Sequence, residues 1–348
     1  MAYTTIDNPE LYFQVKLYTG SGANQSITLD GSEDMQPDLV WIKDRTNTNN
    51  QVWTDSVRGV EKVILSNATN AEATYTDGLT AFNSDGFSLG DDDDGQMNVN
   101  TNACVAWCWK ANGSGSSNTD GTINTTKTSA NTTSGFSINT FEGTGAIATV
   151  GHGLGAAPTV LIVKKTSQGA NWGIGSVHID SWTDYVVFGT GAKEDDANFW
   201  NDTAPTSTVF SIGSSGNINT DDEDHVAYCF TPIQGFSKFG SYTANGSTDG
   251  VFVYTGFRPA FLMTKLTSTS GGGWEVVDSK RDGYNGENNR LYPNDTAAEG
   301  TGNDYDLLSN GFKVRQSGGS QQSGRVNFYM AFAEQPFVNS NGVPCNAR

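Results

Sequence analysis

Charged residues and long apolar runs are both scarce in this chain of 348 residues. Only 17% of the residues are charged, against about 25% in an average globular protein, and 36% are hydrophobic. No run of about 18 apolar residues occurs, so a transmembrane helix is not expected. The opening residues Met1–Thr5 lack the basic and apolar regions of a secretory signal, and none is expected.

Basic residues are also few. The chain has 20 Lys and Arg against 38 Asp and Glu, a formal net charge of −18. Binding to nucleic-acid backbones and to anionic membranes relies on lysine and arginine. We therefore expect neither nucleic acid nor a membrane as a partner, and we interpret the acidity as favouring solubility.

Histidine and cysteine are too few and too dispersed for most catalytic or metal centres. His152, His178 and His225 have no cysteine or acid at the spacing of a zinc site, and no Gly-x-Ser-x-Gly turn is present. On a strand rising ~3.3 Å per residue, Cys104 and Cys108 are about 13 Å apart, too far for a disulfide. Reduced, buried thiols and a non-enzymatic protein are the expectation.

Glycine and aromatic residues are abundant instead. The chain has 41 Gly, 18 Phe, 12 Tyr and 8 Trp, and Asn, Ser and Thr are frequent. Glycine, threonine and aromatic residues are poor helix formers, and this many aromatic residues can build compact cores. The composition predicts an all-β fold.

Four sequence blocks recur three times in the same order, which indicates internal repeats. The first is a proline, an apolar strand and a lysine, and its copies begin at Pro37, Pro158 and Pro259. The second is a tryptophan strand, the third a turn before a phenylalanine, and the fourth a closing strand. The blocks contain Trp53, Trp172 and Trp274; Phe87, Phe210 and Phe312; and strands that begin at Val105, Val226 and Met330.

Residues that recur at one position are predicted to be core. The three block tryptophans belong here, and the closing strands align Trp107 with Tyr228 and Phe332. The same alignment matches Cys108 and Cys229 with Ala333, as expected of a small packing position.

The repeats predict three tandem β-sandwich or jelly-roll-like units of about 100 residues each. We place them at residues 1–112, 113–233 and 234–348, the last with a short C-terminal tail. The polar tract 113–134 is either a flexible linker or, around Thr122–Ser129, an edge strand of the second unit.

Two tryptophans have no counterpart in the other repeats. Trp182 and Trp200 lie in variable loops beside Asp and Asn, a combination suited to stacking on sugars. We expect them to bind a glycan or another receptor. Tyr284, Tyr292 and Tyr305, in a long polar loop of the third repeat, are further candidates of the same kind.

Acidic runs offer a possible metal site. Asp91, Asp92, Asp93 and Asp94 follow a strand end and could ligate Ca²⁺, although they lack the alternating spacing of a calcium loop. A solvated acidic turn is the other interpretation, and no further cofactor is expected. Glycoside hydrolysis needs two carboxyls across a sugar cleft, and no acid is singled out for that role by its surroundings.

The blocks resemble a repeat family of tail-fibre and other virion proteins of marine bacteriophages. The resemblance rests on "YFQVKLYTGSGANQSITLDG", "SANTTSGFSINTFEGTGAIATVGHGLGAAPTVLIVK" and the ending "PFVNSNGVPCNAR", and it extends from Tyr12 to Arg348. It implies a non-enzymatic virion protein with lectin-like β-sandwich repeats, on the exterior of the particle. No catalytic residue is carried over from the family.

Three functions follow as hypotheses. The first is a tail fibre or adhesin that binds a bacterial surface glycan or protein, strengthened by multivalency. The second is a capsid or tail decoration protein that contacts other virion proteins, an alternative that stays open because no anchor domain or coiled-coil shaft precedes the first repeat. The third is a capsule-degrading glycoside hydrolase. A homo-oligomer is expected, with a trimer favoured.

Overall fold

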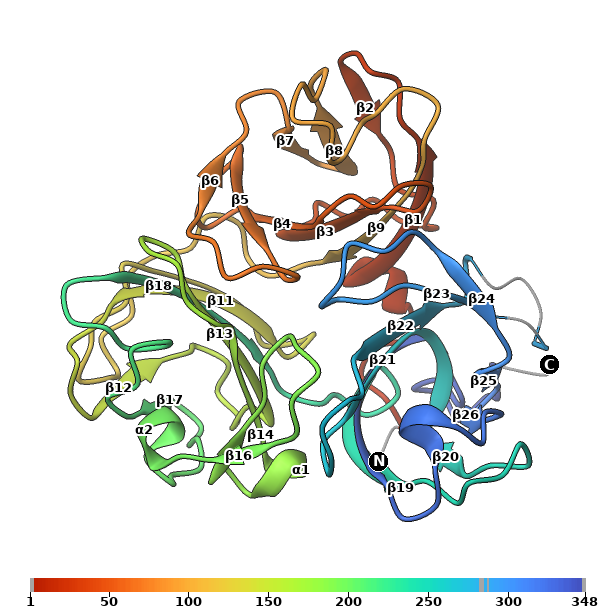
Figure 1. The fold of residues 1–348 in the computed structure, drawn as a ribbon. Helices are drawn as coiled ribbons and strands as arrows, with labels where there is room; N and C mark the ends of the chain where they lie inside the picture. The colour runs from red at the N-terminus through yellow and green to blue at the C-terminus, as the bar shows by residue number, and fades with distance from the viewer. Residues whose placement is uncertain (1–2, 282–284, 287, 346–348) are drawn as a thin grey trace.

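The regular secondary structure of the chain consists almost entirely of antiparallel strands, which confirms the all-β prediction (Figure 1). The computed structural model describes residues 3–281, 285, 286 and 288–345. Helices in these residues are limited to single turns: α1 (Val177–Asp180), α2 (Ala197–Trp200) and the 3₁₀ turns η1 (Pro9–Leu11) and η2 (Gly319–Gln321).

Three main sheets share one strand order: opening strand, closing strand, proline strand and the strand after it. We call residues 13–109 unit 1, residues 127–230 unit 2 and residues 237–336 unit 3. Unit 1 has the order β1 (Phe13–Thr19), β9 (Ala103–Trp109), β3 (Leu39–Asp44), β4 (Gln51–Asp55), β5 (Lys62–Leu65) and β6 (Ala73–Thr74). Unit 2 has β10 (Lys127–Asn131), β11 (Phe136–Glu142), β18 (Asp224–Phe230), β13 (Val160–Lys165) and β14 (Gly173–Ser176). Unit 3 has β19 (Ser237–Thr243), β27 (Val326–Pro336), β21 (Phe257–Leu266) and β22 (Trp274–Asp278).

A smaller sheet packs on the outer face of each main sheet, and each unit has its own outer core. In unit 1 this sheet is β2 (Gln25–Ile27), β8 (Gly86–Leu89) and β7 (Leu79–Asn83). In unit 2 it is β12 (Ala148–Gly151) and β17 (Val209–Ile212), and in unit 3 it is β20 (Phe252–Tyr254), β26 (Gly311–Val314) and β25 (Tyr305–Leu308). Two short ribbons complete the fold: β15 (Asp184–Tyr185) with β16 (Glu194–Asp195), and β23 (Asn288–Arg290) with β24 (Gly300–Gly302).

The inner faces of the three main sheets meet in one central core. Figure 1 shows the units as three lobes around a common centre. A single cluster of buried side chains takes its members from all three units, including Trp41, Ile162 and Met263 at matching positions of the proline strands. The main sheets are therefore covered on both faces, which accounts for the nearly continuous apolar sequences of their proline strands, such as LVWI and VLIV.

The neighbouring units are joined by backbone hydrogen bonds that repeat around the ring. Glu72 N donates to Thr166 O at 2.8 Å, Lys193 N to Thr267 O at 2.9 Å and Glu299 N to Arg45 O at 2.9 Å. These bonds link unit 1 to unit 2, unit 2 to unit 3 and unit 3 back to unit 1. The three units form a closed ring with threefold pseudosymmetry.

Strand pairing corrects the second sequence block. Trp53 lies opposite Trp41, as Ile174 lies opposite Ile162. The unit 1 position that corresponds to Trp172 is therefore Gln51, two residues before Trp53. Gln51 takes over the contact: its Nε2 donates to Tyr292 O at 2.9 Å, as Trp172 Nε1 donates to Leu65 O at 2.9 Å.

Strand pairing also corrects the third closing strand. Met330 lies opposite Met263, in the way that Trp107 lies opposite Trp41 and Tyr228 opposite Ile162. The alignment of Phe332 with Trp107 is thus wrong by two residues, and Ala331 replaces Ala333 as the match of Cys108 and Cys229. The expected burial of Cys104, Cys108 and Cys229 is confirmed, whereas Cys345 is partly exposed.

The polar tract between units 1 and 2 forms regular structure. Its end is the edge strand β10, which pairs with β11. Ser116 and Ile123 make isolated bridges to Thr128 and Val150. Of the two interpretations of this tract, the edge strand agrees with the structure, over Lys127–Asn131. The exact division of the chain into domains stays a prediction.

Candidate functional site

Trp182 and Trp200 are buried, so the expectation that their rings are open to a ligand is wrong. Their exposed fractions are 3% and 0%, and their rings meet edge to face at 6.0 Å in the outer core of unit 2. The short helix α2, capped by Asp196, turns Trp200 inward. Gly175 on β14 makes room for this ring, since a Cβ there would lie 2.4 Å from it.

The three candidate tyrosines are not brought together as a site. Tyr305 is buried, with its hydroxyl 3.0 Å from the hydroxyl of Thr264. Tyr292 is half-buried beside Arg290, and its carbonyl belongs to the contact between units 3 and 1. Tyr284 lies outside the described residues.

The acidic run Asp91–Asp94 does not converge on a metal. Asp92 is buried, and its Oδ2 accepts hydrogen bonds from the amides of Met97 and Asn98 at 2.7 and 2.6 Å. The other three side chains are exposed. In the part of the chain that the structure describes, no group of three or more metal-ligating side chains is present. Asp92 shapes a turn, and the Ca²⁺ hypothesis gains no support.

Two large aromatic side chains are exposed on unit 3. Phe252 and Tyr254, on the edge strand β20, are 44% and 46% exposed. They border an open cavity of about 430 Å³ between β19 and β20, which we call the aromatic groove. His178 of unit 2 and Lys238, Gly240 and Ser241 of β19 complete its rim.

The scaffold does not require aromatic residues at these two positions. In each unit the first strand of the small sheet pairs an inward apolar residue with a phenylalanine: Ile27 with Phe87, Val150 with Phe210 and Val253 with Phe312. The residue before Ile27, Val150 or Val253 is Ser26, Thr149 or Phe252, respectively. The residue after it is Thr28, Gly151 or Tyr254. Only unit 3 places large rings there, at the cost of exposing apolar surface.

Neighbouring groups hold the Tyr254 ring in place. The hydroxyl of Tyr3 lies 2.9 Å from the hydroxyl of Tyr254 and donates to Gly256 O at 3.0 Å. On the other side, Lys238 Nζ donates to Tyr254 O at 2.7 Å and lies 5.4 Å from the ring centroid. A ring fixed in this way loses little freedom when a ligand stacks on it.

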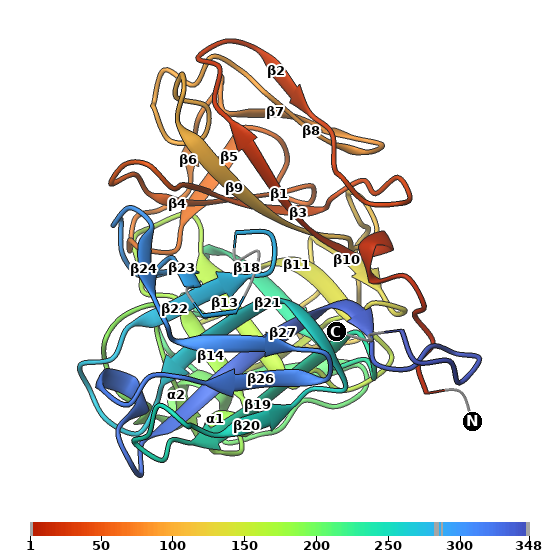
Figure 2. The ribbon, with the colours of Figure 1, turned by 90° about the vertical axis from the view of Figure 1, so that its right-hand side faces the viewer.

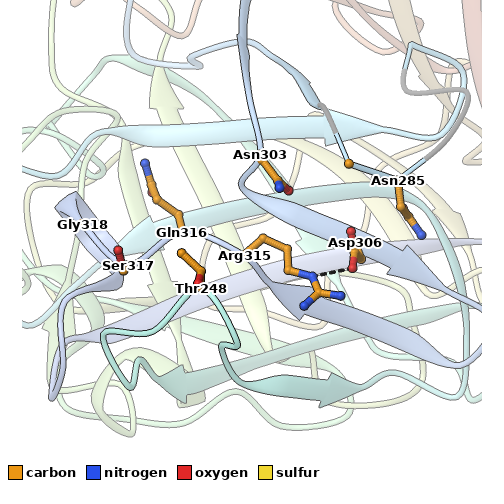
Figure 3. A pocket seen from close by; sticks show the side chains of 9 residues that line it. Thr248, Asn285, Asn303, Asp306, Arg315, Gln316, Ser317 and Gly318 are labelled. Carbon is orange, nitrogen blue, oxygen red and sulfur yellow. Dashed lines mark hydrogen bonds and ion pairs between the residues drawn. The ribbon is translucent and has the colours of Figure 1, made fainter.

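A second, polar cavity of about 740 Å³ lies at the other side of the same small sheet (Figure 3). Thr248, Asn303 and Gln316 contribute to its lining. Arg315 also lines it, but its Nε donates to Asp306 Oδ2 at 2.5 Å, so its charge is neutralised. Its described lining residues offer hydrogen bonds to a ligand but neither a stacking surface nor an unpaired charge.

The buried histidines are engaged by the backbone. His152 Nε2 lies 3.2 Å from Thr206 O, and His225 Nδ1 lies 2.8 Å from Glu223 O. Burial lowers the pKa of both, that of His225 to about 4. Both imidazoles are therefore neutral at pH 7 and serve as structural groups.

The aromatic groove was missed in the sequence, although a signal for it exists. The third repeat reads "VFVYTG" where the first reads "QSITLD" and the second "ATVGHG". Aromatic residues on both sides of an inward valine break the alternation of apolar and polar residues expected of a half-buried strand.

Comparison with known families places the chain. The family model of a domain of unknown function, DUF7483, matches residues 8–336. The chain belongs to this family. The DUF7483 match begins beside η1 and ends with β27, so it covers the whole ring of three units. No curated protein matches the chain, and no helix among the described residues is long and apolar enough to cross a membrane.

Proposed function

We propose that this protein is a non-enzymatic bacteriophage virion protein, displayed on the outside of the particle, that binds the bacterial host surface through the aromatic groove. The observation that carries the proposal is the pair of exposed rings, Phe252 and Tyr254, on the edge strand β20, at positions where the other units have small residues. Exposed aromatic rings beside polar groups are typical of shallow sugar sites. The resemblance of the repeat blocks to tail-fibre proteins supports the virion assignment.

Binding of the purified, fluorescently labelled protein to cells of the phage's host tests this function. We expect saturable binding, and antibody-gold label at the tail of the particle. The double variant Phe252→Ser, Tyr254→Thr carries the residues of unit 1 and should reduce binding at least tenfold. Ser26→Ala, at the corresponding position of unit 1, is the matched control and should bind as the wild type.

A decoration role is the alternative. It requires the same fold but contacts with other virion proteins in place of a receptor. Absence of cell binding, with label spread over the capsid or the tail tube, would support it and reject the adhesin.

Glu275 and Asp304 of unit 3 are two acids with raised pKa values, as a general acid of a hydrolase requires. Burial raises the pKa of Glu275 to about 7, and Tyr305 donates to its Oε2 at 3.3 Å. Burial also raises the pKa of Asp304, whose Oδ2 lies 3.1 Å from Arg290 Nη1. We expect no release of reducing ends from capsular polysaccharide. If release occurs, its loss in Glu275→Gln would identify the acid.

A further inference from the structure

Unit 3 differs from its sister units at four positions that line one groove. Two are the exposed aromatic residues. The third is Lys238, which corresponds in strand register to Gln14 of unit 1 and Ser137 of unit 2. The fourth is Gly240, at the position of Lys16 in unit 1 and Asn139 in unit 2.

Gly240 leaves the groove open. In unit 1 the corresponding Lys16 extends to Asp30, with Nζ and Oδ1 2.5 Å apart. A Cβ at Gly240 would lie 2.7 Å from the hydroxyl of Tyr329, which lines the groove. Any side chain at this position would thus displace the tyrosine and occupy the space between β19 and β20.

Lys238 supplies positive charge that no carboxylate neutralises. Among the described residues, none of the ion pairs within 4.0 Å includes Lys238. His178 lines the same groove from the adjoining unit, and burial together with Lys238 lowers its pKa. No Asp or Glu is among the described residues that line the groove, although the chain has a net charge of −18. A basic spot in an acidic molecule selects anions locally.

We propose that the aromatic groove binds an acidic saccharide, with a sugar ring stacked on Phe252 and Tyr254 and its carboxylate at Lys238. This inference rests on the proposed function and specifies its ligand. The sugar's apolar face matches the aromatic rings, and its hydroxyls match Ser241 and the hydroxyl of Tyr329. The carboxylate accepts a charge-assisted hydrogen bond from an ammonium that already has one acceptor, Tyr254 O.

The charge pattern favours a sugar acid over a nucleic acid, which also combines rings with negative charge. A polynucleotide needs a basic track along several phosphates. Among the described residues that line the groove, Lys238 is the one cationic side chain at pH 7, because the lowered pKa of His178 leaves its imidazole neutral, and a single cation suits one carboxylate.

Calorimetric titration with oligogalacturonate, and with galactose oligomers of equal length, tests the ligand class on the intact protein. We expect at least tenfold tighter binding of the acidic oligomer, weakening with added NaCl because the ion pair is screened. Lys238→Gln, which installs the unit 1 residue, should remove this preference, because any loosening of the Tyr254 ring weakens both oligomers alike and only the acidic one also loses the ion pair. Phe252→Ser should weaken both. Lys16→Gln removes the same charge from unit 1 and should change neither.

The outcomes test the acidic-saccharide ligand separately from the host-binding function. Equal binding of both oligomers, or a preference that survives Lys238→Gln in a variant with unchanged melting temperature, overturns the acidic ligand. If Lys238→Gln lowers the melting temperature, Lys238→Arg provides the second test. This variant keeps the positive charge and must keep the preference for the acidic oligomer. Host-cell binding that Lys238→Gln and Phe252→Ser leave intact also overturns the groove assignment but keeps the adhesin. Absence of host-cell binding rejects the adhesin itself, whatever the titrations show.

Discussion

Three lysines at matching positions are buried at the contacts between units. Lys43, Lys164 and Lys265 are each the last residue but one of a proline strand and are 0%, 0% and 1% exposed. Each Nζ donates to a carbonyl of the neighbouring unit: Thr296 O at 3.2 Å, Thr69 O at 3.0 Å and Gly189 O at 3.0 Å. The lysine of the first sequence block therefore joins the ring, a role that its place in the block does not reveal.

Burial lowers the pKa of each of these lysines to about 8, from 10.5 in the unfolded chain. Between these two values the unfolded state binds more protons than the folded state, so this contribution to stability rises with pH. Below about pH 8 the lysine is protonated in both states, so the folded state bears the full free-energy cost of burying the charge.

Lys164→Met should therefore change the pH dependence of stability. We expect the unfolding free energy of the wild type to increase relative to that of the variant as pH rises from 7.5 to 9.5. Urea denaturation at each pH measures the difference. Tyrosines and thiols titrate equally in both proteins, so their contributions cancel in the difference between the two unfolding free energies. The variant also lacks the hydrogen bonds to Thr69 O and Ala170 O, which lowers its unfolding free energy by an amount that does not depend on pH. Parallel curves would contradict the low pKa.

At the scale of elements, a side chain on the closing strand of one unit donates a hydrogen bond to an aspartate of a neighbouring unit. The aspartate lies at the end of the strand that follows the proline strand. Tyr228 donates to Asp55 Oδ2 at 2.7 Å, and Trp107 Nε1 donates to Asp278 Oδ2 at 3.0 Å. Each aspartate also receives an arginine three residues later, Arg58 or Arg281, at 2.6 Å. The contact between units 3 and 2 lacks this arrangement. The closing strand of unit 3 has Met330, whose side chain has no hydrogen-bond donor. In unit 2, Ser176 takes the position of the aspartate and Ile179 that of the arginine.

Tyr228→Phe should destabilise the protein by about 1–3 kcal/mol, because it removes one donor from a buried carboxylate. Differential scanning calorimetry should show a lower melting temperature. Tyr254→Phe is the control, since its hydroxyl bond to Tyr3 is exposed. Equal effects of the two substitutions would mean that the Tyr228 hydroxyl is not required by Asp55 and Arg58.

The sequence predicted strands well and side-chain exposure poorly, for a physical reason. Proline, lysine and phenylalanine positions repeat because each fills the same place in a pleated sheet. A residue present in one unit alone carries no such information. Trp200 is unmatched and buried, because Gly173 and Gly175 on β14 open space for the α2 turn, whereas Phe252 is unmatched and exposed, because it lies on the solvent side of β20. Only side-chain packing separates these cases.

At the scale of the whole molecule, the boundaries between repeats are not boundaries between independent cores. The central cluster includes Trp41 and Trp107 of unit 1, Ile162 and Tyr228 of unit 2, and Met263 and Phe332 of unit 3. Figure 2 shows unit 1 lying against units 2 and 3. The two ends of the chain also meet, since Ser340 N donates to Asp7 Oδ1 at 2.6 Å. Each unit has an outer core of its own, but its inner face is buried only by the other two.

Thermal unfolding of the full chain should therefore be one cooperative transition, with the calorimetric and van't Hoff enthalpies equal. Tandem sandwiches joined by linkers would instead give three separable transitions. A fragment of residues 1–112 should bind a hydrophobic dye and lack a sharp transition, because Trp41, Trp53 and Trp107 lose their cover. Adding residues 113–348 in trans should restore the transition, since the contacts between the units are complementary around the ring. A fragment that melts sharply alone would show that the outer core suffices, and that the ring is an assembly of finished domains.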